Sequence, residues 1–166
     1  MKKFLFLLFF SSIYLLSISK LFAINHAKKT HEIENDFNID KVKIITKLHN
    51  GSNFDISQTQ KKTILIFWVE WCHICKKQLK ILNKMQSELT KINIQTLGIS
   101  VDNPKNYDRV KKITDSLSFI NTNFYDAVVM NIRQPSAIPT TLLLDENQKI
   151  IKIYEGIIDE DKLLGF

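Results

Sequence analysis

Two cysteines, Cys72 and Cys75, are the residues whose type and spacing most directly predict chemistry in this sequence of 166 residues. Disulfide exchange needs one accessible thiolate and a second thiol close enough to resolve the mixed disulfide. A structural disulfide and two buried free thiols are the alternative interpretations. Neither accounts for a pair that lies between Trp71 and a lysine-rich helix start, so the pair predicts redox chemistry.

A buried strand and an amphipathic helix flank the two cysteines. The continuous apolar run of residues 63–69 predicts a strand buried on both faces. Apolar residues then recur at helical spacing, at Leu79, Leu82, Met85 and Leu89. Cys72 precedes this helix and Cys75 lies one turn inside it, so the helix amides and dipole favour a thiolate at Cys72. We therefore expect Cys72 to attack and Cys75 to resolve.

The remaining segments predict an α/β domain. Apolar alternation around Asn50-Gly51 predicts an N-terminal β-hairpin that starts at Val42. The other predicted elements, in chain order, are a strand at 92–101, a helix after Asp102-Asn103-Pro104 that extends to Leu117, an irregular stretch, a hairpin at 138–154 and a helix from Asp159. This order predicts a mixed central sheet flanked by helices, with the N-terminal hairpin as an extra element.

Three segments resemble the thioredoxin superfamily, and within it the exported TlpA/ResA-like thiol-disulfide oxidoreductases. They are residues 67–76 (FWVEWCHICK), 98–102 (GISVD) and 138–145 (IPTTLLLD), and the resemblance covers about residues 42–166. It implies a thioredoxin-like fold with a redox-active disulfide, Cys72–Cys75, and no other cofactor. It also implies that the Ile138–Pro139 peptide bond is cis. The loop that contains this bond is then expected to lie against the redox pair and to present its backbone to the substrate.

The same resemblance implies partners. They are protein disulfides or dithiols, such as apocytochromes in cytochrome c biogenesis or other envelope proteins, and a membrane thiol-disulfide electron donor. The resemblance favours a reductase, with an oxidant or isomerase as the alternative. The sequence identifies neither the substrate nor the donor.

Several residues at the motif depart from the family pattern. His73 stands between the cysteines, where a partly protonated imidazole would stabilise a thiolate and raise the reduction potential, or would simply be an exposed helix-start residue. Ile74 replaces a common proline and offers an apolar edge beside Cys72. Gln78 and Ile66 occupy the two positions where relatives carry an acid. Glu70 is the sequence-near candidate to accept the Cys75 proton, although a surface role is slightly favoured.

Other functions fit the residues less well. Haem attachment requires His directly after the second cysteine, where this chain has Lys76. A copper-binding thioredoxin-fold chaperone would need a downstream histidine, but His26, His31 and His49 all lie upstream. No metal site is therefore predicted. A non-catalytic interaction domain stays an alternative, but it gives no reason for the cysteine pair.

The N-terminus has the form of an export signal. Residues 1–23 contain three lysines, no acid and about 15 mostly apolar residues, long for a signal peptide core and short for a membrane span. We expect residues 1–23 to be a signal peptide or membrane anchor (residues 4–24), 24–41 a linker, and 42–166 the thioredoxin-like domain. The domain is thus expected outside the cytoplasm, periplasmic, and either free or anchored to the inner membrane.

Net charge argues against a nucleic-acid partner. The chain carries a formal charge of +6, from 23 basic and 17 acidic residues, and three of the lysines belong to the N-terminal segment. The rest holds only two arginines, Arg109 and Arg133, whose planar side chains are favoured for phosphate and base recognition. The charge pattern therefore predicts a domain that does not bind nucleic acid.

Overall fold

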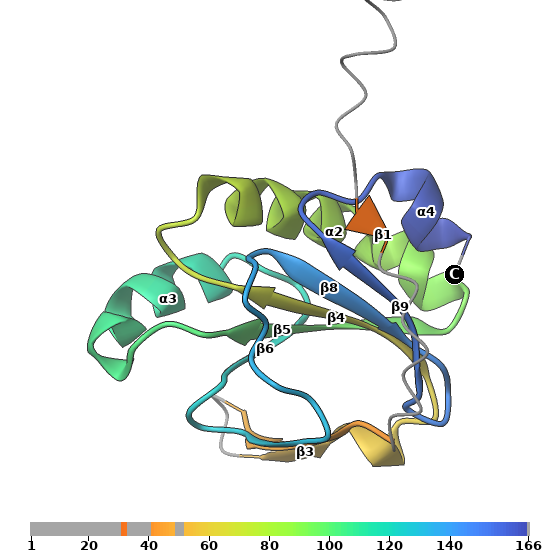
Figure 1. Cartoon of the computed structure of the whole chain (residues 1–166), viewed down its shortest axis with the longest axis horizontal. Helices are drawn as coiled ribbons and strands as arrows, with labels where there is room; N and C mark the ends of the chain where they lie inside the picture. Colours follow the sequence, from red (N-terminus) through yellow and green to blue (C-terminus); the bar gives the residue numbers. More distant parts are fainter. Residues whose placement is uncertain (1–30, 33–40, 49–51, 166) are drawn as a thin grey trace, which may run out of the picture.

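A six-stranded mixed sheet forms the centre of the protein. The structure, a computed structural model, describes residues 31–32, 41–48 and 52–165 (Figure 1). The strands of this sheet, in spatial order, are β1 (His31–Glu32), β9 (Ile150–Glu155), β8 (Thr140–Leu144), β4 (Lys62–Trp68), β5 (Ile94–Ser100) and β6 (Ile120–Asn123). β4, β5 and β6 are parallel, whereas β8 and β9 run antiparallel to their neighbours. The predicted mixed sheet is confirmed.

A separate three-stranded sheet contains the predicted hairpin. Its strands, in order, are β3 (Asn53–Asp55), β2 (Lys43–Lys47) and β7 (Val128–Met130). β2 and β3 are antiparallel, with Thr46 opposite Phe54, which confirms the hairpin; its Asn50-Gly51 turn lies outside the described residues. β6 and β7 fall in the stretch predicted to be irregular. That prediction was wrong because these short strands are specified by pairing with β5 and β2 rather than by local sequence.

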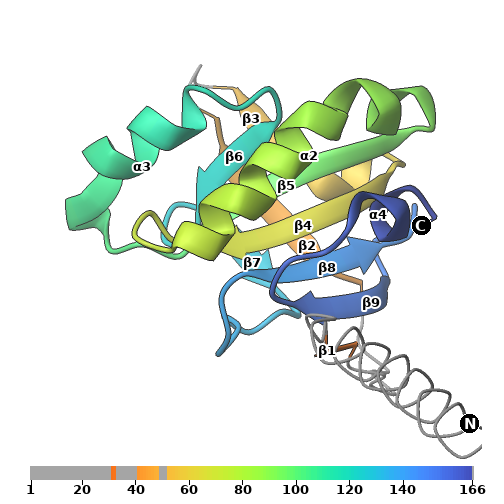
Figure 2. The same cartoon turned by 90° about the horizontal axis from the view of Figure 1, so that it is seen from above.

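The helices all lie on one face of the central sheet, and the three-stranded sheet covers the other face (Figures 1 and 2). They are α2 (His73–Lys91), α3 (Tyr107–Thr114) and α4 (Glu160–Leu164). Two 3-10 turns complete the fold: η1 (Ile56–Gln58), whose Ile56 belongs to the core on the side of the three-stranded sheet, and η2 (Pro104–Asn106), directly before α3. Asn103 caps η2 by accepting the Lys105 N–H at 3.0 Å. The helix predicted to extend to Leu117 thus begins as a 3-10 turn and ends at Thr114.

Two hydrophobic cores hold β4 between these layers. On the helix side Ile66 and Trp68 pack with Leu79 of α2, and on the opposite side Phe67 packs with Ile44 of β2. Every residue of β4 after Lys62 is buried, as the unbroken apolar run predicts. Because both faces of the strand are packed, its carboxyl end is a fixed base for the cysteine motif.

The predicted export segment, residues 1–23, lies outside the described residues, and so does the linker at 24–41 apart from His31, Glu32 and Lys41. His31 and Glu32 form β1, which pairs with Glu155 and Tyr154 of β9. Within the part of the chain that the structure describes, no helix combines the length and the apolar character of a membrane span.

Candidate redox site

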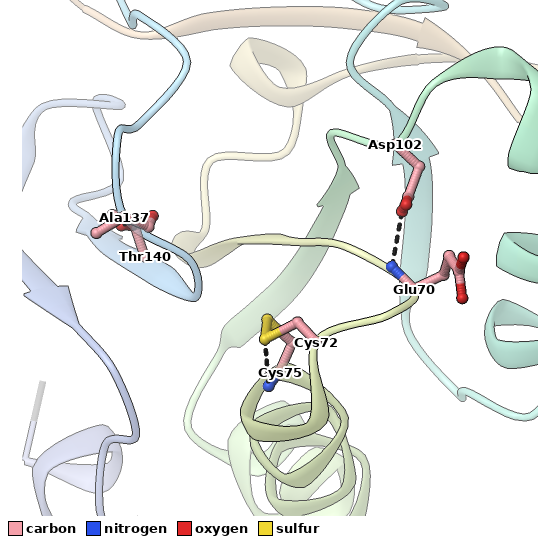
Figure 3. Close-up of a disulfide and its surroundings, with 6 residues drawn as sticks. All are labelled: Glu70, Cys72, Cys75, Asp102, Ala137 and Thr140. Carbon is pink, nitrogen blue, oxygen red and sulfur yellow. Dashed lines mark hydrogen bonds between the residues drawn. A yellow bond between two sulfur atoms is a disulfide. The ribbon is translucent and has the colours of Figure 1, made fainter.

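The cysteine pair lies at the junction between β4 and α2. Cys72 is the N-cap of α2: its Sγ accepts a hydrogen bond from the Cys75 N–H at 3.1 Å, and its own N–H donates to the Val69 carbonyl. The two cysteines form a disulfide, with Cα atoms 5.2 Å apart (Figure 3). Cys72 therefore stands before the helix and Cys75 inside its first turn.

The two sulfurs differ in accessibility. Cys75 is fully buried and belongs to the core on the helix side of the sheet, whereas Cys72 is half-buried. The neighbours of Cys72 are open to solvent: the exposed fraction is 73% for Trp71 and 43% for Ile74, and His73 is also exposed. A substrate can thus approach this side of the pair, where an aromatic ring, an imidazole and an aliphatic side chain surround the outer cysteine.

The loop before β8 faces this end of α2 (Figure 3). The Ile138–Pro139 peptide bond is cis, as the family resemblance implies. Ile138 packs against both cores, as Cys72 does. The Pro139 carbonyl accepts a 2.9 Å hydrogen bond from Gly156, whose φ of 88° favours glycine, and Thr140 Oγ1 donates to the Ala137 carbonyl at 2.7 Å. The backbone hydrogen bond to Gly156, directly after β9, and this side-chain bond hold the loop in place.

Glu70 is held in the loop between β4 and α2, not on the surface. Its exposed fraction is 8%, and its carboxylate Oε1 lies 3.3 Å from Arg109 Nη1 of α3. The carboxylate points away from the two sulfurs in Figure 3. At the start of α3, burial and a hydrogen bond to Asp126 raise the pKa of Tyr107 to about 12. The hydrogen bond to Asp126 links the start of α3, the helix that carries Arg109, to the segment between β6 and β7.

The two positions where the family resemblance implies an acid are neutral in this chain and lie in the core. Gln78, one turn after Cys75, is fully buried, and its Oε1 accepts the Ile158 N–H at 2.7 Å. Its Nε2 has no hydrogen-bond partner among the described residues. Ile66 of β4 is also fully buried. Gln78 thus connects α2 to the segment that follows β9 and has no group that ionises.

Asp102 is a residue of the site that the sequence did not single out. The sequence placed it only in the segment before the next helix, where Asn103 makes the cap that was expected before Pro104. Asp102 is instead 2% exposed, and its Oδ2 accepts hydrogen bonds from the Glu70 N–H at 2.9 Å and from Ser100 Oγ at 2.7 Å. Because β4 and β5 are parallel and adjacent, their carboxyl ends meet, and that pairing is the signal that could have found it.

The arrangement can perform thiol–disulfide exchange: one sulfur is accessible at a helix N-terminus, and its buried partner is positioned to displace a bound substrate. Within residues 41–48 and 52–165, no group of three or more histidine, cysteine or acidic side chains is placed to hold a metal ion.

Several known proteins are similar to this chain in sequence or in fold. The chain is 28% identical to the thiol-disulfide oxidoreductase ResA of Geobacillus thermodenitrificans over 105 residues, which cover 62% of this chain and 59% of that relative. The matched part therefore spans less than two thirds of the relative.

Two solved structures have the same fold. StoA from Bacillus subtilis has a TM-score of 0.56 at 22% identity, covering 74% of this chain and 94% of StoA. A secreted thiol-disulfide isomerase from Corynebacterium glutamicum has a TM-score of 0.63 at 20% identity, covering 84% of this chain and 90% of the isomerase. These likenesses confirm the predicted thioredoxin-like fold.

A family model also matches most of the chain. The model of the AhpC/TSA family aligns with residues 35–164, which include the cysteine motif, the loop of Pro139 and every strand from β2 to β9. This chain belongs to the AhpC/TSA family of the thioredoxin superfamily.

Proposed function

We propose that this protein is an exported thiol-disulfide oxidoreductase that reduces disulfides of other proteins through Cys72 and Cys75. One observation carries the proposal: a half-buried Cys72 at the N-cap of α2 is bonded to a fully buried Cys75 and faces the Ile138–Pro139 loop. The similarity to ResA supports the reaction class.

The proposed reaction has two exchange steps. The Cys72 thiolate attacks one sulfur of the substrate disulfide, so a Cys72–substrate disulfide forms and the other substrate sulfur leaves as a thiolate. The Cys75 thiolate then attacks Cys72 Sγ, which forms the Cys72–Cys75 disulfide and releases the second substrate thiol. Two electrons and the two thiol protons pass to the substrate, and a dithiol of a membrane electron donor restores the reduced pair.

A redox titration tests whether the pair is catalytic or structural. The protein is equilibrated in glutathione and dithiothreitol buffers, and its free thiols are alkylated and counted by mass spectrometry. We expect a two-electron couple between about −270 and −120 mV, the range of thioredoxin-fold exchange proteins. A pair that stays oxidised at potentials below roughly −300 mV would be a structural disulfide and would refute the proposal.

The same titration decides the direction of electron flow. A potential near the negative end of that range fits a reductase, whereas one near the positive end fits an oxidant, and the exposed His73 shifts the expectation toward the middle. Protein disulfides of the cell envelope, including those of apocytochromes, are the proposed substrates. Their reduction by the wild-type protein, and not by Cys72→Ser, would show that they are accepted.

Export is tested with a reporter that becomes active only outside the cytoplasm, fused after residue 166. We expect the fusion to be active because Lys2 and Lys3 precede an apolar run. The matched control replaces Leu7 and Leu8 with lysine, which interrupts the run and should abolish reporter activity. An inactive wild-type fusion, or equal activity of the control, would contradict export by this segment.

A further inference from the structure

Asp102 is an acidic residue in the interior whose carboxylate touches no charged partner among the described contacts. Its exposed fraction is 2%, and Oδ2 accepts the Ser100 hydroxyl and the backbone N–H of Glu70. The second oxygen, Oδ1, has no hydrogen-bond partner among the described residues. A buried carboxylate oxygen without a partner lowers stability, so the contacts of Oδ2 are what hold this side chain in the interior.

The amide that Asp102 holds belongs to the loop that delivers the outer cysteine. Pairing between β4 and β5 ends at Trp68, after which Val101 donates to the Trp68 carbonyl at 2.9 Å. The Glu70 amide comes next on the loop and lies two residues before Cys72. Figure 3 shows the Asp102 carboxylate reaching it from the end of β5. The Asp102 side chain therefore holds the loop to the sheet at a point beyond the last residue pair of β4 and β5.

From these contacts we propose that Asp102 is a positioning residue for Cys72. Its carboxylate fixes the Glu70 amide and thereby sets the path of residues 69–72, so that the Cys72 sulfur stays aligned with the amides of the first turn of α2. Ser100 supports the carboxylate by donating to the same Oδ2. The inference rests on the proposed exchange through Cys72, and it requires an acceptor at residue 102 rather than a negative charge.

The test compares second-order rate constants for reduction of oxidised glutathione by the reduced, folded protein. We expect Asp102→Ala to lower the rate constant by about tenfold, because small displacements of a reacting group reduce rates strongly. Asp102→Asn keeps an oxygen that accepts the Glu70 N–H and should stay within about threefold of wild type. Ser100→Ala removes one support and should lower the rate constant about two- to threefold.

Thr46→Ala is the matched control for loss of a buried polar side chain. Thr46 is 3% exposed, and its Oγ1 forms a 2.5 Å hydrogen bond with Thr122 Oγ1, which joins β2 to β6. We expect this variant to lose stability but to keep the wild-type rate constant. Urea unfolding of each variant verifies that the rates are measured on folded protein.

The outcomes separate this inference from the proposed function. If wild type reduces no disulfide, the proposed function itself fails. If wild type is active and Asp102→Ala is equally fast, or Asp102→Asn is as slow as Asp102→Ala, the positioning role is wrong. Should Asp102→Ala not fold, an unchanged rate constant in Ser100→Ala overturns the inference, and a rate reduced in Ser100→Ala but not in Thr46→Ala supports it.

Discussion

The residues around Cys72 and those around Cys75 differ in exposure and polarity, although only one helical turn separates the two cysteines. On the outer side Cys72 is half-buried among exposed Trp71, His73 and Ile74. On the inner side Cys75 is fully buried, and Gln78 one turn further is fully buried as well. One side is therefore polar, aromatic and reachable, and the other is neutral and closed.

This difference supports the separate tasks that we propose for the two sulfurs. In the proposed function the outer sulfur meets the substrate, and the loop between Ala137 and Thr140 lies across from it (Figure 3). The inner sulfur is shielded from outside thiols and can react with the partner that Cys72 brings. Glu70 takes no part in this division of tasks, because its carboxylate points away from both sulfurs and pairs with Arg109.

The largest effect is expected when the inner side receives a charge, in Gln78→Glu. One carboxyl oxygen can still accept the Ile158 N–H, but burial will raise the pKa of the new carboxyl. The folded state then retains a proton that the unfolded state has lost above about pH 4.3, so stability falls as pH rises. Urea unfolding should show the variant losing on the order of 2 kcal/mol relative to wild type between pH 5 and pH 8. A difference from wild type that does not change with pH would contradict a closed, neutral inner side.

A smaller effect is expected from the loop on the outer side. Thr140→Val removes the hydrogen bond from Oγ1 to the Ala137 carbonyl and should lower the free energy of unfolding by about 1 kcal/mol. We also expect the rate of disulfide reduction to fall a few-fold because the loop is less fixed. The matched control is Thr114→Val, which removes a bond of the same kind, from Oγ1 to the Lys111 carbonyl, within α3. Equal rates in both variants would mean that the loop needs no side-chain support.

How much of this could be predicted from sequence differs between the two sides. The apolar run of residues 63–69 and the helical spacing of apolar residues after Cys75 place the cysteines at a strand–helix junction, because both signals are local and strong. The partners of Gln78 and Glu70 could not be predicted. Ile158 and Arg109 are distant in sequence, and only tertiary packing brings them to the site.

The polar support of the loop was missed for the same reason. Asp102 reads in sequence as a residue before a helix, and its role appears only when β4 and β5 are paired in parallel. β6, with the sequence Ile-Asn-Thr-Asn, carries no clear alternation of its own. Its extended conformation is specified by pairing with β5 and not by its own sequence.

His73→Ala tests how far the outer side tunes the thiolate of Cys72. His73 is exposed at the first position of α2, where the surrounding water weakens its electrostatic effect on Cys72. Because 30 mV corresponds to 1.4 kcal/mol for a two-electron couple, we expect the potential to become more negative by about 10–20 mV. A glutathione titration measures the shift. A potential unchanged within error would make His73 a solvated helix-start residue only.

The smallest effect is expected from Arg109→Ala. Arg109, which pairs with Glu70, is largely exposed. An ion pair with one partner in solvent contributes at most about 1 kcal/mol to stability. Disulfide reduction should stay within about twofold of wild type, as in the control Lys111→Ala, which removes the exposed partner of Asp115 on the same helix. A tenfold loss of rate confined to Arg109→Ala would connect the Glu70 carboxylate to the chemistry after all.

The division of tasks between the two sulfurs is tested most directly by trapping the intermediate. Reduced Cys72→Ser and Cys75→Ser proteins are each mixed with a peptide disulfide, and the adducts are measured by mass spectrometry without reductant. We expect Cys75→Ser to accumulate a mixed disulfide at Cys72, and Cys72→Ser to form almost none because its remaining thiol is buried. Equal trapping by the two variants, or trapping at Cys75 alone, would contradict the account.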